Sequence, residues 1–223
     1  MKIVGLVPIK LNSERLKNKN ILPFENGEPL IHYIQKTLLQ VKGIDESYVY
    51  CSDDVIKNYL IDGIAYKKRE TYLDDSKTPF NEVLFKFADE VIADYYVLTH
   101  STAPFIKSES IERGIQTILD GGYDSAVGVN RLYDFLWKDN APLNYNLNDI
   151  PRTQDLPLIY AETCGLYIYS RELIINQRRR IGDNPYFVEL SKIESIDIND
   201  KDDFIIANAI FNESRISIGG EYE

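Results

Sequence analysis

The feature of this sequence that most restricts its fold is the alternation of short β-branched runs with segments of helical periodicity. The first run, residues 2–9, is rich in Val and Ile and shows no polar alternation, which is typical of a strand covered on both faces. Residues 29–41 follow after a loop and place apolar side chains at helical spacing. Repetition of this unit predicts right-handed crossovers between parallel strands. We therefore predict an α/β fold, in which a mainly parallel, twisted sheet is flanked by helices.

The same periodicities give bounds for the later elements. We expect strands at residues 47–51, 64–68, 95–99, 125–129, 166–169 and 194–198, and helices at residues 53–61, 79–91, 108–119 and 200–211. Thr78 fits the N-cap of the helix at 79–91, and Pro79 fits its first helical position. Gly121 and Gly122 fit the exit of the helix at 108–119.

The alternation stops between residues 133 and 157, where aromatic residues mix with Asn, Asp and Pro. This composition favours a hairpin that leaves the sheet over a further strand-helix-strand unit. The sequence contains no internal repeat and no flexible linker. We predict a single domain over residues 1–223, with an excursion around residues 133–160 that serves dimerisation or substrate selection.

Charge and cysteine content disfavour several classes of function. The formal net charge of −10 disfavours a nucleic acid polymer as partner, because such binding draws its free energy from Lys and Arg displacing counterions. Cys51 and Cys164 have no spacing that signals a disulfide framework or a zinc site. The N-terminal apolar run is too short to span a bilayer and lacks the flanks of a signal peptide. We expect a cytoplasmic protein with no membrane partner.

The loop after the first strand is where an open parallel sheet collects its ligands. This loop contains four cations, a hydroxyl and three amides: Lys10, Arg15, Lys17, Lys19, Ser13, Asn12, Asn18 and Asn20. Such groups suit phosphate oxygens and ribose hydroxyls, and a solvated basic loop explains them about equally well. The loop has neither the Walker pattern nor the dinucleotide fingerprint, so kinase and dehydrogenase functions lose their main support.

Residues 8–20 resemble the signature Pro-Ala-Arg-Gly-Gly-Ser-Lys-Gly-x-x-x-Lys-Asn of the acylneuraminate cytidylyltransferases, the CMP-sialic acid synthetases, which are related to the CMP-KDO synthetases. Lys10 stands at the Arg of the signature, Ser13 at its Ser, and Lys19 with Asn20 at its closing pair. Leu11 and Asn12 replace its two glycines. Further segments resemble the family in the same order: residues 51–54, 69–75, 98–104, 152–157, 162–168 and 196–200. In these segments His100 stands at a family glutamine, Cys164 at an asparagine and Asn199 at a carboxylate.

The resemblance implies a nucleotide-diphospho-sugar transferase-like, Rossmann-like fold. It implies an enzyme that transfers CMP from CTP to a sialic acid-like or KDO-like sugar acid with release of pyrophosphate, for surface polysaccharide or glycoconjugate synthesis. It also implies Mg²⁺ as cofactor and a homodimer.

The resemblance also assigns roles to residues. The implied catalytic residues are Lys10, Lys19 and Asp197. The implied nucleotide-binding residues are Lys10, Asn12, Ser13, Lys19, Asn20, Arg69 and His100. The implied acceptor-binding residues are Asp75, His100, Thr102 and Gln154. A carboxylated sugar also needs a cation, which Lys138 or Arg152 could supply. Asp197 and Asn199 are the implied metal ligands, and Asp197 is the better candidate because it keeps its carboxylate.

Two other functions remain open from the sequence. A glycosyltransferase of similar build is the rival enzyme; such enzymes commonly carry an Asp-x-Asp metal motif after a central strand, and Asp53-Asp54 and Asp74-Asp75 are not that motif. A non-catalytic nucleotide-binding homologue is the rival from another class, and the changes at His100 and Asn199 favour it. Single residues also have structural explanations: Asn199 or Asp200 as a helix cap, and Lys138 or Arg152 as members of surface ion pairs.

Overall fold

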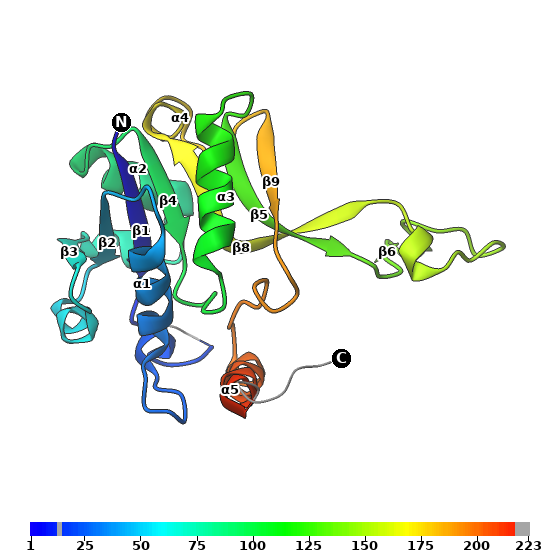
Figure 1. Cartoon of the computed structure of the whole chain (residues 1–223), viewed down its shortest axis with the longest axis horizontal. Helices are drawn as coiled ribbons and strands as arrows, with labels where there is room; N and C mark the ends of the chain where they lie inside the picture. Colours follow the sequence, from blue (N-terminus) through cyan, green and yellow to red (C-terminus); the bar gives the residue numbers. More distant parts are fainter. Residues whose placement is uncertain (13–14, 217–223) are drawn as a thin grey trace.

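The computed structural model describes residues 1–12 and 15–213 in full and the backbone of residues 214–216. Its centre is a seven-stranded sheet in the order β3-β2-β1-β4-β8-β5-β9 (Figure 1). The strands are β1 (Ile3–Ile9), β2 (Glu46–Cys51), β3 (Ile64–Lys68), β4 (Tyr95–Thr99), β5 (Ser125–Leu132), β8 (Ile159–Ser170) and β9 (Pro185–Glu189). Strand β8 pairs antiparallel with β4 and β5, and the other neighbouring pairs are parallel. The predicted α/β fold with a mainly parallel sheet is confirmed.

Helices cover both faces of the sheet. The helices are α1 (Leu30–Gln40), α2 (Phe80–Glu90), α3 (Ser108–Leu119), α4 (Arg171–Gln177) and α5 (Lys201–Ile216), and the 3₁₀ turns are η1 (Lys19–Ile21), η2 (Asp54–Tyr59), η3 (Thr71–Asp74) and η4 (Thr153–Asp155). Residues of α1 and α3 share one apolar cluster with the sheet, and residues of α2 and α4 share another. No helix within 1–12 and 15–216 combines the length and apolar character needed to cross a membrane.

Strand β1 shows why its sequence is a continuous apolar run. Ile3, Val7 and Ile9 pack into the cluster of α1 and α3, whereas Val4 and Leu6 pack into the cluster of α2 and α4. Successive side chains of a strand point to opposite faces, so a strand covered on both sides needs apolar residues at odd and even positions alike.

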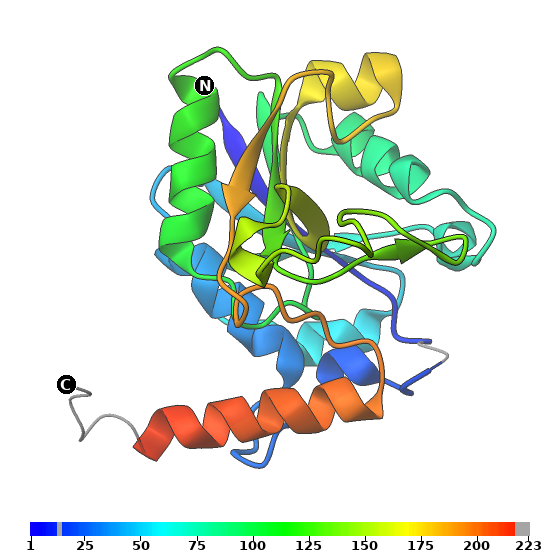
Figure 2. The same ribbon diagram turned by 90° about the vertical axis from the view of Figure 1, so that its right-hand side faces the viewer.

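Helix α5 lies at the edge of the sheet where the parallel strands end, next to the start of α1 (Figure 2). Phe204, Ala207 and Phe211 of α5 pack with Phe24 in a small third cluster. The rings of Phe24 and Phe204 stack with centroids 4.6 Å apart. These contacts hold the chain just before α5 against the carboxyl edge of the sheet.

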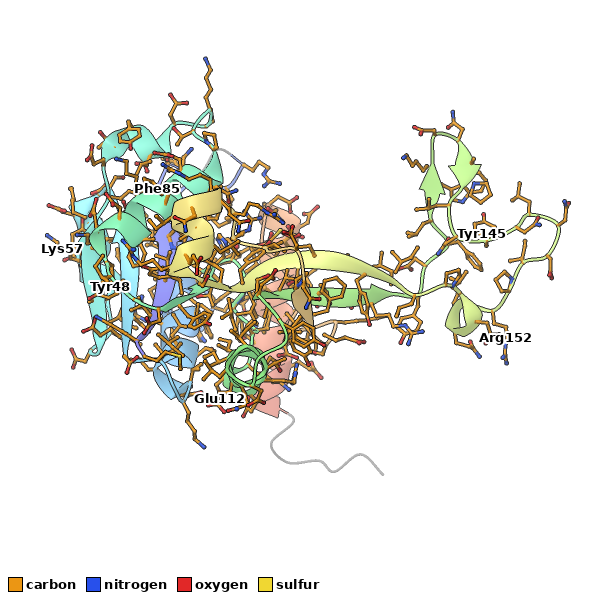
Figure 3. All side chains as sticks on the ribbon, turned by 90° about the horizontal axis from the view of Figure 1, so that it is seen from above. Tyr48, Lys57, Phe85, Glu112, Tyr145 and Arg152 are labelled. Atoms are coloured by element: carbon orange, nitrogen blue, oxygen red, sulfur yellow. The ribbon has the colours of Figure 1, made fainter. Side chains whose placement is uncertain are left out.

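The predicted excursion forms a long arm. Strands β5 and β8 run past the helical layers as an antiparallel ribbon, and its far end carries the hairpin of β6 (Trp137–Lys138) and β7 (Ala141–Pro142) (Figures 1 and 3). Figure 3 places Tyr145 and Arg152 on this arm, well away from the helices. We use the name arm for residues 133–158.

The predicted strand at 194–198 is wrong. Ile198 donates its backbone N–H to the Thr102 carbonyl at 2.8 Å, and its side chain is buried in the third cluster. Glu194 is also buried, and its carboxylate accepts from the hydroxyl of Ser110 at 2.6 Å. The apolar alternation reflects burial of an irregular segment, since a period of two does not require a strand partner.

Other bounds differ from the prediction in smaller ways. Strand β9 and helix α4 were not predicted, and the segment expected as a helix at 53–61 is the 3₁₀ turn η2. Thr78 is not the N-cap of α2: Pro79 holds that position, and the Thr78 hydroxyl donates to the Tyr72 carbonyl at 3.0 Å. Gly121 and Gly122 have φ of 84° and 96°, which confirms their role at the exit of α3.

Candidate active site

A pocket of about 310 Å³ opens at the carboxyl ends of β1 and β4. The strand order places these two strands side by side, with β2 and β3 lying beyond β1. Chain direction across the sheet reverses at this point, which is where open α/β sheets bind ligands. The lining residues are Pro8, Lys10, Lys19, Asn20, Arg69, Leu73, Asp74, Asp75, Ser76, Thr78, Phe80, Val83, His100, Ser101 and Thr102.

Seven residues that the sequence singled out meet in this pocket, namely Lys10, Lys19, Asn20, Arg69, Asp75, His100 and Thr102. They come from the loops that follow β1, β3 and β4. Loops at the carboxyl ends of adjacent parallel strands converge on one edge of the sheet, which explains how segments distant in sequence share a site.

Asn20 braces the loop that carries the predicted cations. Its side chain is buried, and its Nδ2 donates to the carbonyl of Lys10 at 2.8 Å. Its Oδ1 accepts from the hydroxyl of Ser101 at 2.8 Å. The amide therefore joins the loop after β1 to the loop after β4, and fixes where the Lys10 side chain begins.

Lys19 and Asp197 form the charged edge of the site. The Lys19 ammonium donates to the carbonyl of Ile198. Burial lowers the pKa of Lys19, while the carboxylate of Asp197 acts in the opposite direction. The bond between Ile198 and Thr102 ties the Asp197 segment to the pocket rim. Lys19 and Asp197 thus lie close enough to interact electrostatically at a pocket whose lining includes both cations and carboxylates.

Asn199 has both ends of its amide engaged. Its Nδ2 donates to Oδ2 of Asp197 at 2.8 Å, and its Oδ1 accepts from Nη2 of Arg15 at 2.7 Å. The cap of α5 is provided instead by Asp200, whose Oδ1 accepts from the backbone N–H groups of Asp202 and Asp203 at 3.0 Å and 3.1 Å. Asn199 therefore links Arg15 to Asp197, and the Asn199 oxygen faces a guanidinium.

His100 lines the pocket from the loop after β4. Its ring is 5.5 Å from the ring of Phe80, centroid to centroid. Burial lowers the pKa of His100 to about 4, with the charges of Asp197, Arg180 and Lys19 as smaller influences. The imidazole is therefore neutral at pH 7 and offers one N–H donor and one nitrogen acceptor to a ligand.

Arg69 is held by an ion pair inside the protein. Its side chain is 4% exposed, its Nη2 donates to Oδ1 of Asp74, and Ser52 donates to Oδ2 of the same carboxylate. The guanidinium carbon lies 5.8 Å from the ring centroid of Tyr50. The Nε of Arg69 is buried and has no hydrogen-bond partner within the described part of the chain, so a donor remains for a ligand in the pocket.

The remaining predicted residues do not line the pocket. Asn12 is exposed on the loop after β1, and Ser13 lies outside the described residues. Lys138 is exposed on β6, and Gln154 is exposed on η4. Arg152 pairs with Asp155 at 2.7 Å, and its side chain is 72% exposed. The structure places the last three on the arm.

Several pocket residues escaped the sequence reasoning. Asp74 lay within a matched segment, and the separation of five positions from Arg69 suits an ion pair across a tight turn. Ser101 follows a predicted strand end, which was a usable signal. Phe80 gave no signal, because its approach to His100 depends on how α2 packs against the sheet.

Asp197 meets the requirement of a magnesium ligand in its donor chemistry. One carboxylate oxygen accepts from Asn199, and the other accepts no hydrogen bond from the described residues. Mg²⁺ prefers hard oxygen ligands and is commonly held by one or two carboxylates together with substrate phosphates. No group of three or more His, Cys, Asp or Glu side chains in the described ranges could hold a metal. Within the described ranges a metal at Asp197 would therefore be held by at most two such side chains.

The fold and the pocket define an open α/β protein with a cationic ligand site at the switch point of its sheet. The chain belongs to the cytidylyltransferase family: the family model matches residues 4–194. This is a family of nucleotidyltransferase enzymes, and the resemblance noted in the sequence is confirmed.

Individual relatives agree with the family. The chain is 22% identical over 220 residues to an N-acylneuraminate cytidylyltransferase of Streptococcus agalactiae serotype V, covering 92% of this chain and 52% of that protein. It is 24% identical over 200 residues to an 8-amino-3,8-dideoxy-manno-octulosonate cytidylyltransferase of Shewanella baltica, covering 78% and 77%. The chain thus spans about half the length of the N-acylneuraminate cytidylyltransferase.

A solved structure shows the same fold. It is CMP:2-keto-3-deoxy-manno-octonic acid synthetase complexed with CTP, with a TM-score of 0.72, 16% identity, and coverage of 96% of this chain and 100% of that one. The nucleotide-sugar transferase-like fold expected from the sequence is thereby confirmed.

Proposed function

We propose that this protein transfers CMP from CTP to a sugar acid of the sialic acid or KDO class and releases pyrophosphate. The observation that carries the proposal is the meeting of Lys10, Lys19, Arg69 and His100 in one pocket, with the Asp197 carboxylate beside it. Family membership and the printed activities of the relatives support the same reaction.

The reaction forms a bond between an acceptor hydroxyl oxygen and the α-phosphorus of CTP, and it breaks the bond from that phosphorus to pyrophosphate. Lys10 and Lys19 neutralise negative charge on the triphosphate. Asn20 keeps the cationic loop in place through its bonds to Lys10 and Ser101. Positioning the two reactants in line supplies much of the rate enhancement, since no covalent enzyme intermediate is required.

Mg²⁺ is the proposed cofactor, held by Asp197 and by the phosphates of the substrate. When bound it would neutralise phosphate charge and orient the reacting oxygens. In the present geometry Asn199 is not arranged as a second ligand, because its oxygen accepts from Arg15 and its nitrogen faces Asp197. Asn199 instead orients the Asp197 carboxylate.

The arm is the proposed dimer contact. It carries large apolar side chains that are 38–61% exposed: Tyr133, Phe135, Trp137, Leu143, Leu147, Ile150 and Leu158. An extended element with this much exposed apolar surface has the character of an interface. We propose a homodimer in which a second copy covers these residues, and in which Lys138, Arg152 and Gln154 retain a role in acceptor selection.

The proposed reaction takes place in the cytoplasm. Cys51 and Cys164 are free thiols, the first buried and the second exposed. Reduced thiols suit the cytosol, where disulfides are rare.

Pyrophosphate release tests the proposal. The protein is incubated with CTP, Mg²⁺ and a panel of eight-carbon and nine-carbon sugar acids. Lys10→Ala and Asp197→Ala are expected to lower the rate by about 100-fold or more, as removal of one charge-stabilising group commonly does. Lys17→Ala is the matched control, because Lys17 is exposed on the same loop and does not line the pocket. Wild-type rates in the first two variants would refute the assignment.

A non-catalytic nucleotide-binding protein is the second candidate, and the engaged Asn199 is the observation that favours it. This candidate predicts that CTP binds with no pyrophosphate release for any acid in the panel. Calorimetric titration of CTP into the wild-type protein, beside the activity assay, separates the two functions.

A further inference from the structure

Arg180 is a partly buried cation in the segment between α4 and β9. Its side chain is 25% exposed. The guanidinium carbon lies 4.4 Å from the ring centroid of Tyr167 and 5.6 Å from that of Phe80. Aromatic faces attract a guanidinium and restrict the plane it adopts. The Arg180 side chain is therefore oriented by packing, as a binding group needs to be.

Arg180 makes only long hydrogen bonds to its polar partners. Its hydrogen bonds to Asn81 Oδ1, Glu162 Oε1 and the Tyr167 hydroxyl are each 3.4 Å long. Its Nε is buried and has no hydrogen-bond partner in the described ranges. Glu162 also accepts a hydrogen bond from the Tyr167 hydroxyl, so its carboxylate is shared. A buried guanidinium with an unused donor and only long bonds asks for an explanation.

The two preceding arginines show the contrast. Arg178 pairs with Glu82 at 3.0 Å, and Arg179 pairs with Asp183 at 2.8 Å. The side chains of Arg178 and Arg179 are 49% and 42% exposed, compared with 25% for Arg180. Three consecutive arginines thus include two with short surface ion pairs and one, Arg180, whose ion pair with Glu162 is longer, at 3.4 Å.

Arg180 lies next to the wall of the active-site pocket. Phe80, which it contacts, lines the pocket and packs near His100. Besides burial, the positive charge of Arg180 also contributes to lowering the pKa of His100. Lys10 and Lys19 belong to the loop after β1, whereas Arg180 approaches from the side of α2 and β8. The pocket therefore has one cationic wall suited to phosphates, and Arg180 contacts Phe80 on another side, outside the residues that line the pocket.

We infer that Arg180 binds the carboxylate of the acceptor. Its guanidinium donates two N–H bonds to this carboxylate in place of its 3.4 Å hydrogen bonds to Glu162 and Tyr167. The inference rests on the proposed function and adds the residue that recognises the acid. A sugar acid carries one anionic group that the triphosphate cations do not serve. A guanidinium matches a planar carboxylate with two parallel N–H bonds. Within one protomer, the other candidate cations Lys138 and Arg152 lie on the arm.

The test compares Arg180→Gln and Arg180→Lys with Arg179→Gln as matched control. The Michaelis constant for the sugar acid is expected to rise by about 100-fold in Arg180→Gln, the size expected when one partner of a buried charge pair is removed. Arg180→Lys keeps the positive charge but cannot donate two parallel N–H bonds. Its Michaelis constant for the sugar acid is expected to lie between those of the wild-type protein and Arg180→Gln. The constant for CTP stays at its wild-type value in all three, and thermal unfolding with CTP titration confirms that each variant is folded.

The carboxamide of the same acceptor distinguishes recognition of the acid from a structural role. Wild-type protein is expected to prefer the acid over the carboxamide strongly, and Arg180→Gln is expected to lose most of that preference. An unchanged ratio in Arg180→Gln, or an equal rise in the constants for CTP and acceptor, would overturn the inference alone. If wild-type protein releases no pyrophosphate with any acid, the proposed function and the inference fall together.

Discussion

The amide of Asn199 joins Asp197 to Arg15: its Nδ2 lies 2.8 Å from Oδ2 of Asp197, and its Oδ1 lies 2.7 Å from Nη2 of Arg15. The Asp197 carboxylate is thereby oriented by a neutral neighbour. The proposed metal site then depends on one protein carboxylate, and substitution at 199 changes both the charge and the orientation of that site.

Asn199→Asp is expected to lower the Mg²⁺ concentration that gives half-maximal pyrophosphate release, by about tenfold. A second carboxylate supplies another hard ligand, and changes of this size are typical for groups around a metal site. The measurement is the rate as a function of Mg²⁺ at saturating CTP. Asp200→Asn alters the cap of α5 and should leave the Mg²⁺ dependence unchanged. An unaltered half-saturation in Asn199→Asp would count against Asp197 as the metal ligand.

Stability is expected to depend on pH through His100. Burial lowers its pKa to about 4, and the unfolded side chain titrates near 6.5. Between these values the unfolded state binds a proton that the folded state does not, so the free energy of unfolding decreases as the pH falls. The full effect is up to about 3 kcal/mol between pH 7 and pH 4.

Denaturant unfolding of the wild-type protein and of His100→Gln across this pH range measures that dependence. The carboxylates that also titrate there are common to both proteins, so the difference between the two curves isolates His100. If the free energies of unfolding of the two proteins changed in parallel with pH, the imidazole of His100 would titrate normally in the folded state.

Asp74→Asn is expected to lower the free energy of unfolding by about 3 kcal/mol. The change keeps the volume of the side chain and removes the charge that balances the buried guanidinium of Arg69. Removal of one member of a buried ion pair leaves the other charge uncompensated. Asp75→Asn is the control, because this neighbouring carboxylate is exposed and should change stability by less than about 1 kcal/mol. Equal effects of the two substitutions would contradict the structural role of the pair.

Trp137→Asp is expected to convert the proposed dimer into a monomer. Trp137 is 56% exposed on the arm, and a charge at the centre of an apolar contact disfavours association because the charge would be desolvated. Sedimentation velocity at several protein concentrations gives the result. Ile92→Asp is a matched control, since Ile92 is 61% exposed on the body of the protein and should not alter the oligomeric state. A monomeric wild-type protein would refute the arm as a dimer contact.

The sequence by itself determined the class of fold and the cationic part of the site. Runs such as residues 2–9 and 108–119 carry their periodicity locally, and the structure has a strand at Ile3–Ile9 and a helix at Ser108–Leu119. The loop after β1 could be chosen because ligands gather where parallel strands end. Lys10, Lys19 and Asn20 are close in sequence, so their shared location needed no long-range information.

Only the tertiary structure decided the features that depend on contacts between distant segments. Residues 194–198 alternate like a strand, yet they have no strand partner. Glu194 and Ile198 are buried instead by loop contacts, since Ile198 meets the loop after β4 and the third apolar cluster. The antiparallel direction of β8 follows from the return of the arm to the sheet between β4 and β5, and β9 takes the edge by pairing parallel with β5. Arg180 looks like its two neighbours in the sequence. Its inward position is set by the packing of α4 against α2 and β8, which no local pattern encodes.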